Sequence, residues 1–185
     1  MSSLTATVRM YRLDELGDCF LLTFRDGETT SRMLVDCGSF RNSNASKARL
    51  QEIIADISAE ANGAALDVVV GTHQHNDHVS GFVHCEDELK AVGVSQVWLP
   101  WLDDPQDATA VEIGQQHKNL QRALYSARSK LQSIAGAKAK DKLSVVDDIL
   151  GFYGANAKAP PELPAEAVRR LKVLGEKKPR YLRPG

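Results

Sequence analysis

The sequence predicts an α+β fold with a helical segment at its C-terminal end. Over the first hundred residues, short runs rich in Thr, Val, Leu and aromatic residues alternate with segments of helical periodicity. After Pro105 the pattern becomes helical and polar, with few apolar residues. A chain of 185 residues is long enough to bury the core of one domain. We therefore expect one α+β unit at residues 1–105 and a helical extension or insertion at residues 106–185.

Each expected element follows from a local pattern. Strands are indicated by β-branched and aromatic residues bounded by turn signals such as Asp26-Gly27, and we place them at residues 5–12, 19–24, 33–36, 66–70 and 94–99. Helices are indicated by apolar residues three or four positions apart, and we place them at residues 47–60, 82–92, 111–134, 143–152 and 165–174. Asn62-Gly63 is typical of a helix end, and three prolines within 158–164 predict a rigid break.

Composition and charge exclude several classes of protein. A net charge of −1 gives no general attraction to nucleic acid or to an anionic membrane. No apolar run is long enough to span a membrane, and the first residues lack the basic flank and apolar core of a secretory signal. The chain has three scattered cysteines, which favours a reducing compartment over a disulfide framework. We expect a cytoplasmic protein without a membrane partner.

Residues 72–78 read Thr-His-Gln-His-Asn-Asp-His and carry most of the functional information. Imidazole nitrogen and carboxylate oxygen are good ligands for zinc and neighbouring divalent metals. The run follows the apolar segment 66–70, which we expect to be a buried strand leading into a loop. In an extended chain alternate side chains share one face, so His73, His75 and Asp77 are expected to converge. A turn would then bring in His78.

Two other interpretations of this motif are weaker. Histidines crowded together without a metal would repel one another when protonated. A structural zinc site favours four ligands and is commonly rich in cysteine. None of Cys19, Cys37 and Cys85 forms a Cys-x-x-Cys pair, so the sequence favours a catalytic metal site with open positions for water. The expected metal ligands are His73, His75, Asp77 and His78.

Two further segments accompany the motif, the turn Val35-Asp36-Cys37-Gly38 and the strand-like run at residues 16–22, Leu-Gly-Asp-Cys-Phe-Leu-Leu. Together these three features resemble the metallo-β-lactamase superfamily, in particular the subgroup that includes the hydrolase-like domain of DNA-uptake competence proteins. The resemblance covers about residues 5–100. It implies an α/β/β/α sandwich with the metals at one edge of its two sheets, of which this chain would hold only the first half.

The resemblance also implies roles for individual residues. His73 and His75 would hold the first metal, and Asp77, the expected catalytic carboxylate, would hold the second with His78. Asp36 would lie outside the ligands and orient the site through a hydrogen bond. A simpler role for Asp36, capping the turn at the end of a strand, is equally consistent with the sequence. Asp18 we interpret as structural.

After residue 78 the chain departs from the family pattern, in which a third histidine and a later Asp and His complete the two metal sites. Only His84 and His117 follow, and both lie in expected helices, where surface or packing roles are favoured. The last residues, 181–185, are typical of the approach to another turn. We therefore expect the first half of a longer hydrolase, or a truncated relative, completed by a downstream segment or a second chain.

A completed site of this kind is expected to bind two zinc ions, with iron or manganese as alternatives, and to use metal-bound hydroxide to hydrolyse an ester or phosphodiester. As this fragment alone, the chain could be inactive. The substrate would be a small molecule or a nucleic acid. The phosphates of a nucleic acid would bind to basic residues near the end of the chain: Arg169, Arg170, Lys172, Lys177, Lys178, Arg180 and Arg183. The alternative is that these residues only form a solvated surface. The alternative is a non-catalytic binding or scaffold module whose long helix, 111–134, meets a partner.

Overall fold

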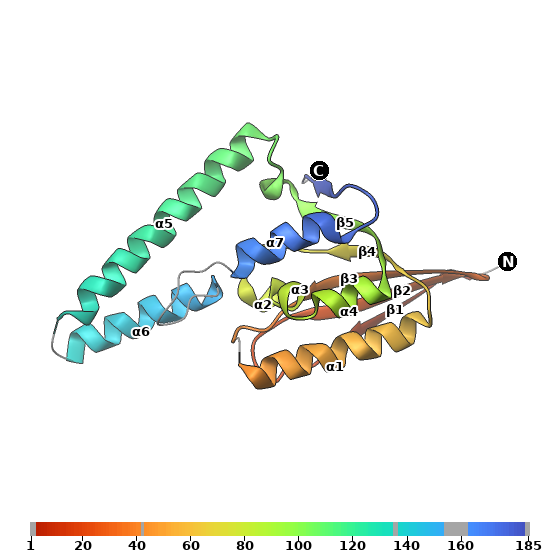
Figure 1. Ribbon diagram of the computed structural model, residues 1–185, viewed down its shortest axis with the longest axis horizontal. Helices are drawn as coiled ribbons and strands as arrows, with labels where there is room; N and C mark the ends of the chain where they lie inside the picture. The colour runs from red at the N-terminus through yellow and green to blue at the C-terminus, as the bar shows by residue number, and fades with distance from the viewer. Residues whose placement is uncertain (1–2, 42, 135–136, 154–162, 184–185) are drawn as a thin grey trace.

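The computed structural model describes residues 3–41, 43–134, 137–153 and 163–183, which form one mixed six-stranded sheet with helices (Figure 1). The strands are adjacent in chain order, β1 (Thr5–Met10), β2 (Cys19–Asp26), β3 (Thr29–Cys37), β4 (Leu66–Val70), β5 (Val94–Pro100) and β6 (Arg180–Leu182). Strands β1 to β3 are antiparallel, whereas β3 to β6 are parallel. The predicted α+β class is confirmed.

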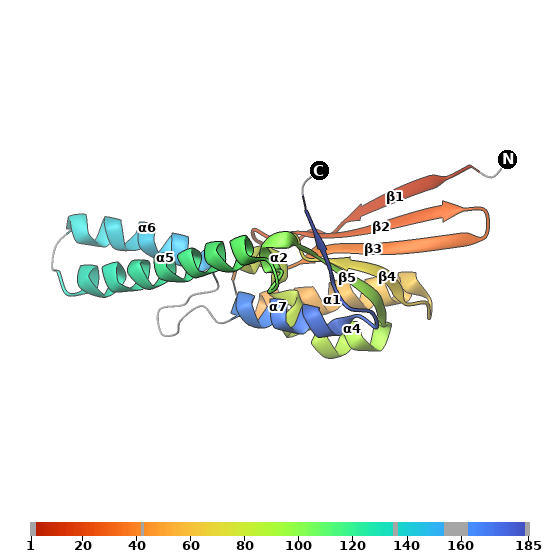
Figure 2. The same ribbon diagram turned by 90° about the horizontal axis from the view of Figure 1, so that it is seen from above.

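The described residues contain seven α-helices and one short 3-10 helix: α1 (Asn44–Ala61), α2 (Asn76–Val79), α3 (Gly81–His84), α4 (Glu86–Val92), η1 (Trp101–Asp103), α5 (Ala108–Gln132), α6 (Ala137–Phe152) and α7 (Leu163–Leu174). Helices α1, α4 and α7 lie on one face of the sheet (Figure 2). Within the described part of the chain, no helix is both long and apolar enough to cross a membrane.

Helix α1 shows how local signals fix an element. It begins three residues before the predicted start because the Ser43 side chain caps it, accepting a hydrogen bond from the backbone N–H of Ser46. It ends at Asn62, which adopts a left-handed conformation with φ of 51°, as the Asn-Gly pair predicted. Between these caps the four predicted apolar positions are fully buried against the sheet: Leu50, Ile53, Ile54 and Ile57.

The helix predicted at residues 82–92 is interrupted and begins earlier than expected. The chain already turns into α2 at Asn76, and Cys85, with φ of −123° and ψ of 31°, separates α3 from α4. Close packing accounts for this path. A Cβ atom on Gly81 would lie 2.4 Å from the Sγ atom of Cys37, so the backbone of α3 rests directly on the end of β3.

The C-terminal segment, predicted as a helical extension or insertion at residues 106–185, lies partly outside the sheet and partly on it. Helices α5 and α6 form a hairpin that projects from the sheet (Figure 1), but α7 returns to the helical layer. Ala167 and Leu171 of α7 are fully buried in the same core as the residues of β4 and β5. The strand β6, which was not predicted, pairs with β5 from Trp98 onward. The expected proline break lies mostly outside the described residues.

The second face of the sheet is apolar and lies opposite these helices. A row of register partners crosses five strands on this face: Met10, Phe20, Val35, Val70 and Trp98. Met10 is 69% exposed and the other four are partly buried. Parallel strands usually carry packed layers on both faces, so an apolar face of this kind is typical of a sheet that packs against a further layer.

Substitutions in α7 test whether the C-terminal segment belongs to the folded core. Leu171→Ala is expected to lower the free energy of unfolding by about 2–5 kcal/mol, because it leaves a cavity at a fully buried position. Val173→Ala in the same helix is the matched control, since Val173 is 73% exposed, and should change stability by less than about 0.5 kcal/mol. Equal effects in chemical denaturation would contradict the placement of α7.

Candidate metal centre

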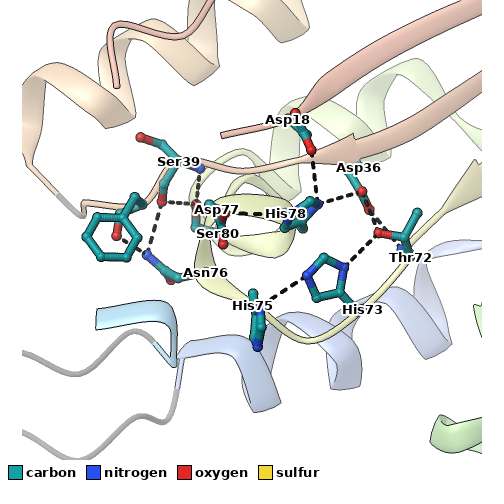
Figure 3. Close-up of polar contacts among 11 residues, drawn as sticks. Asp18, Asp36, Ser39, Thr72, His73, His75, Asn76, Asp77, His78 and Ser80 are labelled. Carbon is teal, nitrogen blue, oxygen red and sulfur yellow. Dashed lines mark hydrogen bonds and ion pairs between the residues drawn. The ribbon is translucent and has the colours of Figure 1, made fainter. Parts of the chain in front are cut away.

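The motif residues lie at one edge of the sheet, where segments from three strands meet (Figure 3). Asp18 directly precedes β2, Asp36 is near the end of β3, and the motif at 72–78 follows β4. Since β2 is antiparallel to β3 and β4 is parallel to it, these three positions fall at the same edge. The fold thus brings together residues that lie far apart in the sequence.

The second half of the motif is helical and not extended as predicted. His75 keeps an extended backbone and precedes α2, so Asp77 and His78 lie in the first turn of a helix. The fully buried Asn76 anchors this turn by donating hydrogen bonds from its side chain to the carbonyl oxygens of Ser39 and Phe40. The helical turn directs the ring of His78 back toward that of His73.

Asp36 connects the end of β3 to the motif. One carboxylate oxygen accepts a hydrogen bond from the backbone N–H of Thr72 at 2.8 Å, and the other accepts from the Thr72 hydroxyl at 2.6 Å. The second oxygen is also 2.8 Å from Nδ1 of His78. This contact leaves Nε2 of His78 as the nitrogen available to a metal. Asp36 is 97% buried and has a left-handed φ of 53°, a conformation that persists only where the surroundings enforce it.

Asp18 also belongs to the site, although the sequence had indicated a structural role. Its carboxylate lies 3.5 Å from Nδ1 of His78, and one ligand atom from each of Asp18, Asp36 and His78 lies within 4.8 Å of the other two. The backbone N–H of Asp18 donates to the carbonyl of Asp77, and its own carbonyl accepts from Gly38. The sequence held one signal for this role of Asp18. Asp18 directly precedes a predicted strand, and that strand pairs with the strand that carries Asp36.

The ring of His73 contacts the rings of both other histidines of the motif. Nε2 of His73 lies 3.1 Å from Nδ1 of His75, and their ring centroids are 4.6 Å apart. The ring centroids of His73 and His78 are 3.9 Å apart. Nδ1 of His73 is 3.0 Å from the hydroxyl of Thr72, the same residue that Asp36 holds. His73 therefore links the other two rings, but among the described residues the group whose donor atoms all lie within 4.8 Å of one another is Asp18, Asp36 and His78, without His73, His75 or Asp77.

Asp77 is a buried carboxylate with one oxygen that lacks a partner. It is 95% buried, its Oδ1 atom has no hydrogen-bond partner, and its Oδ2 atom lies 3.6 Å from Nε2 of His78. Within the described residues, the sole ion-pair partner of Asp18, Asp36 and Asp77 is His78. Leaving a buried carboxylate oxygen unsatisfied is costly, and a bound cation removes this cost. The donor set therefore fits a divalent metal.

The electrostatic surroundings divide the histidines into two groups. Burial lowers the pKa of His73 and of His75, and the neighbouring imidazoles lower both further, so these rings favour the neutral form that binds metals. Burial also acts to lower the pKa of His78, but its hydrogen bond to Asp36 and the charges of Asp36, Asp77 and Asp18 outweigh this effect. The pKa of His78 is therefore raised.

The two later histidines have different surroundings. His84 lies in α3, where burial and the charges of Lys47 and Arg170 lower its pKa to about 4, and it does not join the motif. His117 lies on α5 and lines the same cleft as His73 and His75. Its charge contributes to the lowered pKa of His75. The sequence offered no signal for this proximity, because it depends on how α5 packs.

Comparison of the chain with protein-family models, curated proteins and solved structures found no match.

Replacing Asp36 tests the central contact of the site. Asp36→Asn removes the charge that raises the pKa of His78, so in the metal-free protein this pKa should fall below that of the wild type. A pH titration of the histidine ring signals by NMR measures the shift. Asp67→Asn, near the opposite end of β4, is the matched control and should leave the pKa of His78 unchanged. A pKa of His78 that is equal in the wild type and Asp36→Asn would contradict the contact.

Proposed function

We propose that this chain is a metal-dependent hydrolase of the metallo-β-lactamase type, with His73, His75, Asp77 and His78 as metal ligands. The observation that carries the proposal is the buried, unpartnered carboxylate oxygen of Asp77 next to His78, whose ring contacts that of His73, which in turn contacts His75. Buried carboxylates without a hydrogen bond are rare in folded proteins, and mixed nitrogen and oxygen donors suit zinc, iron and manganese.

The donors divide into two half-sites. His73 and His75 form the first, at the wall of a cleft, and Asp77 and His78 form the second. Asp18 adds a carboxylate near the second half-site that the sequence had not assigned to it. The first half-site, with His73 and His75 alone, is short of the three protein ligands usual for catalytic zinc, so we propose that a further segment or a second chain completes the centre.

The residues of this chain prepare the site for hydrolysis. A bound zinc would supply Lewis acidity and lower the pKa of coordinated water from 15.7 to about 7. Asp36 holds the proton on Nδ1 of His78 and fixes the orientation of that ring. The lowered pKa values of His73 and His75 keep their nitrogen lone pairs available near neutral pH. Asp77 supplies negative charge inside a buried pocket.

The arrangement of the sheet supports the same family. One layer of helices covers one face, and the opposite face carries the apolar row Met10, Phe20, Val35, Val70 and Trp98. We propose that this face packs against a second sheet, so that the chain represents the first half of an α/β/β/α sandwich. A second layer of this kind is also where the missing metal ligands would be expected.

The basic residues near the end of the chain favour a small-molecule substrate over a nucleic acid. Arg170 forms ion pairs with Glu86 and Glu166, and Arg183 pairs with Asp107. These two guanidinium groups already have carboxylate partners, which would compete with the phosphates of a nucleic acid. We therefore propose a small ester or phosphoester as the substrate.

The cysteines support a reducing, cytoplasmic location. All three are buried and unlinked. Cys19 and Cys37 are register partners on neighbouring strands, a position from which an oxidising compartment would favour a disulfide. We propose a reducing, cytoplasmic location because the sequence holds only three scattered cysteines.

A second candidate function, a non-catalytic binding or scaffold module, is favoured by the surface of the projecting hairpin. Leu120 and Ile134 at α5 and Val145 of α6 are each more than half exposed. Exposed apolar residues on a projecting element are typical of a surface that meets another protein. A scaffold of this kind would need no metal at the motif.

Metal analysis distinguishes the two candidates. Protein purified with zinc should retain about one to two zinc ions per chain, and the form in which a second chain or a further segment completes the site should hydrolyse a generic substrate such as 4-nitrophenyl acetate or bis(4-nitrophenyl) phosphate. His73→Ala and Asp77→Asn should each weaken zinc binding by about 10–100-fold and abolish hydrolysis.

His84→Gln is the matched control, because His84 lies outside the site and its replacement should leave zinc content unchanged. Less than one zinc per chain, with no dependence on His73 and no hydrolysis, would favour the scaffold.

A further inference from the structure

A cleft of about 570 Å³ opens beside the first half-site. One wall is the motif loop with His73 and His75, and the opposite wall is formed by α5. The segment around η1 and the start of α7 complete the lining. Small-molecule sites in proteins usually measure about 300–1,000 Å³, so this cleft is large enough for one such ligand.

The wall formed by α5 is partly apolar and leaves room for a ligand. Val111, Ile113 and Gly114 line this side, together with Leu102 of η1. A Cβ atom built on Gly114 would meet no atom within 4 Å. Glycine inside a helix costs about 1 kcal/mol relative to alanine, so this position gives up helix stability while leaving open space in the cleft wall.

The polar side chains of the cleft favour a negatively charged ligand. Lys118 and His117 of α5 and Lys172 of α7 all line it. Among the described residues, Lys118 has no ion-pair partner. The Nζ atom of Lys172 donates to the backbone carbonyl of Asp103 and leaves two further N–H donors.

The acidic groups in the same cleft already have partners. The carboxylate of Asp103 is buried and accepts a hydrogen bond from the side chain of Gln74, and burial raises its pKa. The carboxylate of Asp104 accepts from the backbone N–H of Gln106. Lys172 acts electrostatically on the Asp103 carboxylate, so Lys118 is the cationic group of the cleft that is most available to a ligand.

We propose that this cleft binds a small amphipathic anion, with an apolar body against α5 and an anionic group near Lys118 and Lys172. The projecting hairpin is then the specificity wall of the site. His73 and His75 line the same cleft, so the ligand would be the substrate of the proposed hydrolase. Only this identification of the ligand as a substrate rests on the proposed function. Binding itself requires neither metal nor turnover.

The test uses 1-naphthyl phosphate as the probe, with the full chain, without added metal, in isothermal titration calorimetry. The wild type should bind 1-naphthyl phosphate at least about tenfold more tightly than 1-naphthol or inorganic phosphate, since each of these lacks one half of the recognised chemistry. Gly114→Trp fills the open space and should weaken binding at least about tenfold. Gly114→Ala is the matched control, and should bind as the wild type does.

A surface variant keeps the test independent of changes in folding. Lys118→Gln should weaken the binding of 1-naphthyl phosphate about three- to tenfold and leave that of 1-naphthol unchanged. Absence of binding by the wild type, or equal affinities in the wild type and Gly114→Trp, would overturn the proposal. If the protein takes up no zinc but its binding of 1-naphthyl phosphate depends on Gly114, the result would support the cleft as a ligand site and contradict the proposed hydrolase. Zinc-dependent hydrolysis without binding of 1-naphthyl phosphate would support the hydrolase and overturn the proposal for the cleft.

Discussion

The hydrogen bond between Asp36 and His78 is the contact on which the rest of the site depends. It joins the end of β3 to a helical turn forty-two residues later, and the same carboxylate fixes Thr72 at the start of the motif. Because Asp36 holds the two ends of the motif, the rings of His73 and His78 are brought into contact, tilted by 51°. The left-handed backbone of Asp36 is a cost that these three hydrogen bonds offset.

Glycine allows these segments to approach closely enough for that contact. A Cβ atom on Gly38 would lie 2.5 Å from the backbone of His78, and one on Gly17 would lie 2.2 Å from the carbonyl oxygen of Gly38. The chain before β2, the end of β3 and the turn of α2 are therefore in backbone contact. Rigid support of this kind is what a metal centre needs, because ligand geometry must be held by the surrounding shell.

Much of this arrangement could be predicted from local sequence. Strong apolar periodicity located α1 and the strand Leu66–Val70, and the density of histidine and aspartate located the site. The features that the sequence did not predict depend on how distant segments pack together. The strand β6 has only three residues and forms because β5 offers it an edge, and the roles of Asp18 and His117 arise from contacts made by distant segments. No local pattern encodes such contacts. The motif was expected to be extended because alternation alone cannot reveal a helix of four residues.

The central claim, that these rings and carboxylates hold a metal, is tested most directly by X-ray absorption at the zinc edge on the zinc-loaded chain. The account predicts nitrogen and oxygen neighbours at about 2.0–2.2 Å, with the outer-shell scattering of at least two imidazoles. A spectrum with sulfur at about 2.3 Å would place the zinc on cysteine instead. A shell of oxygen alone, without imidazole scattering, would show that the histidines do not bind the metal, and either result would contradict the account.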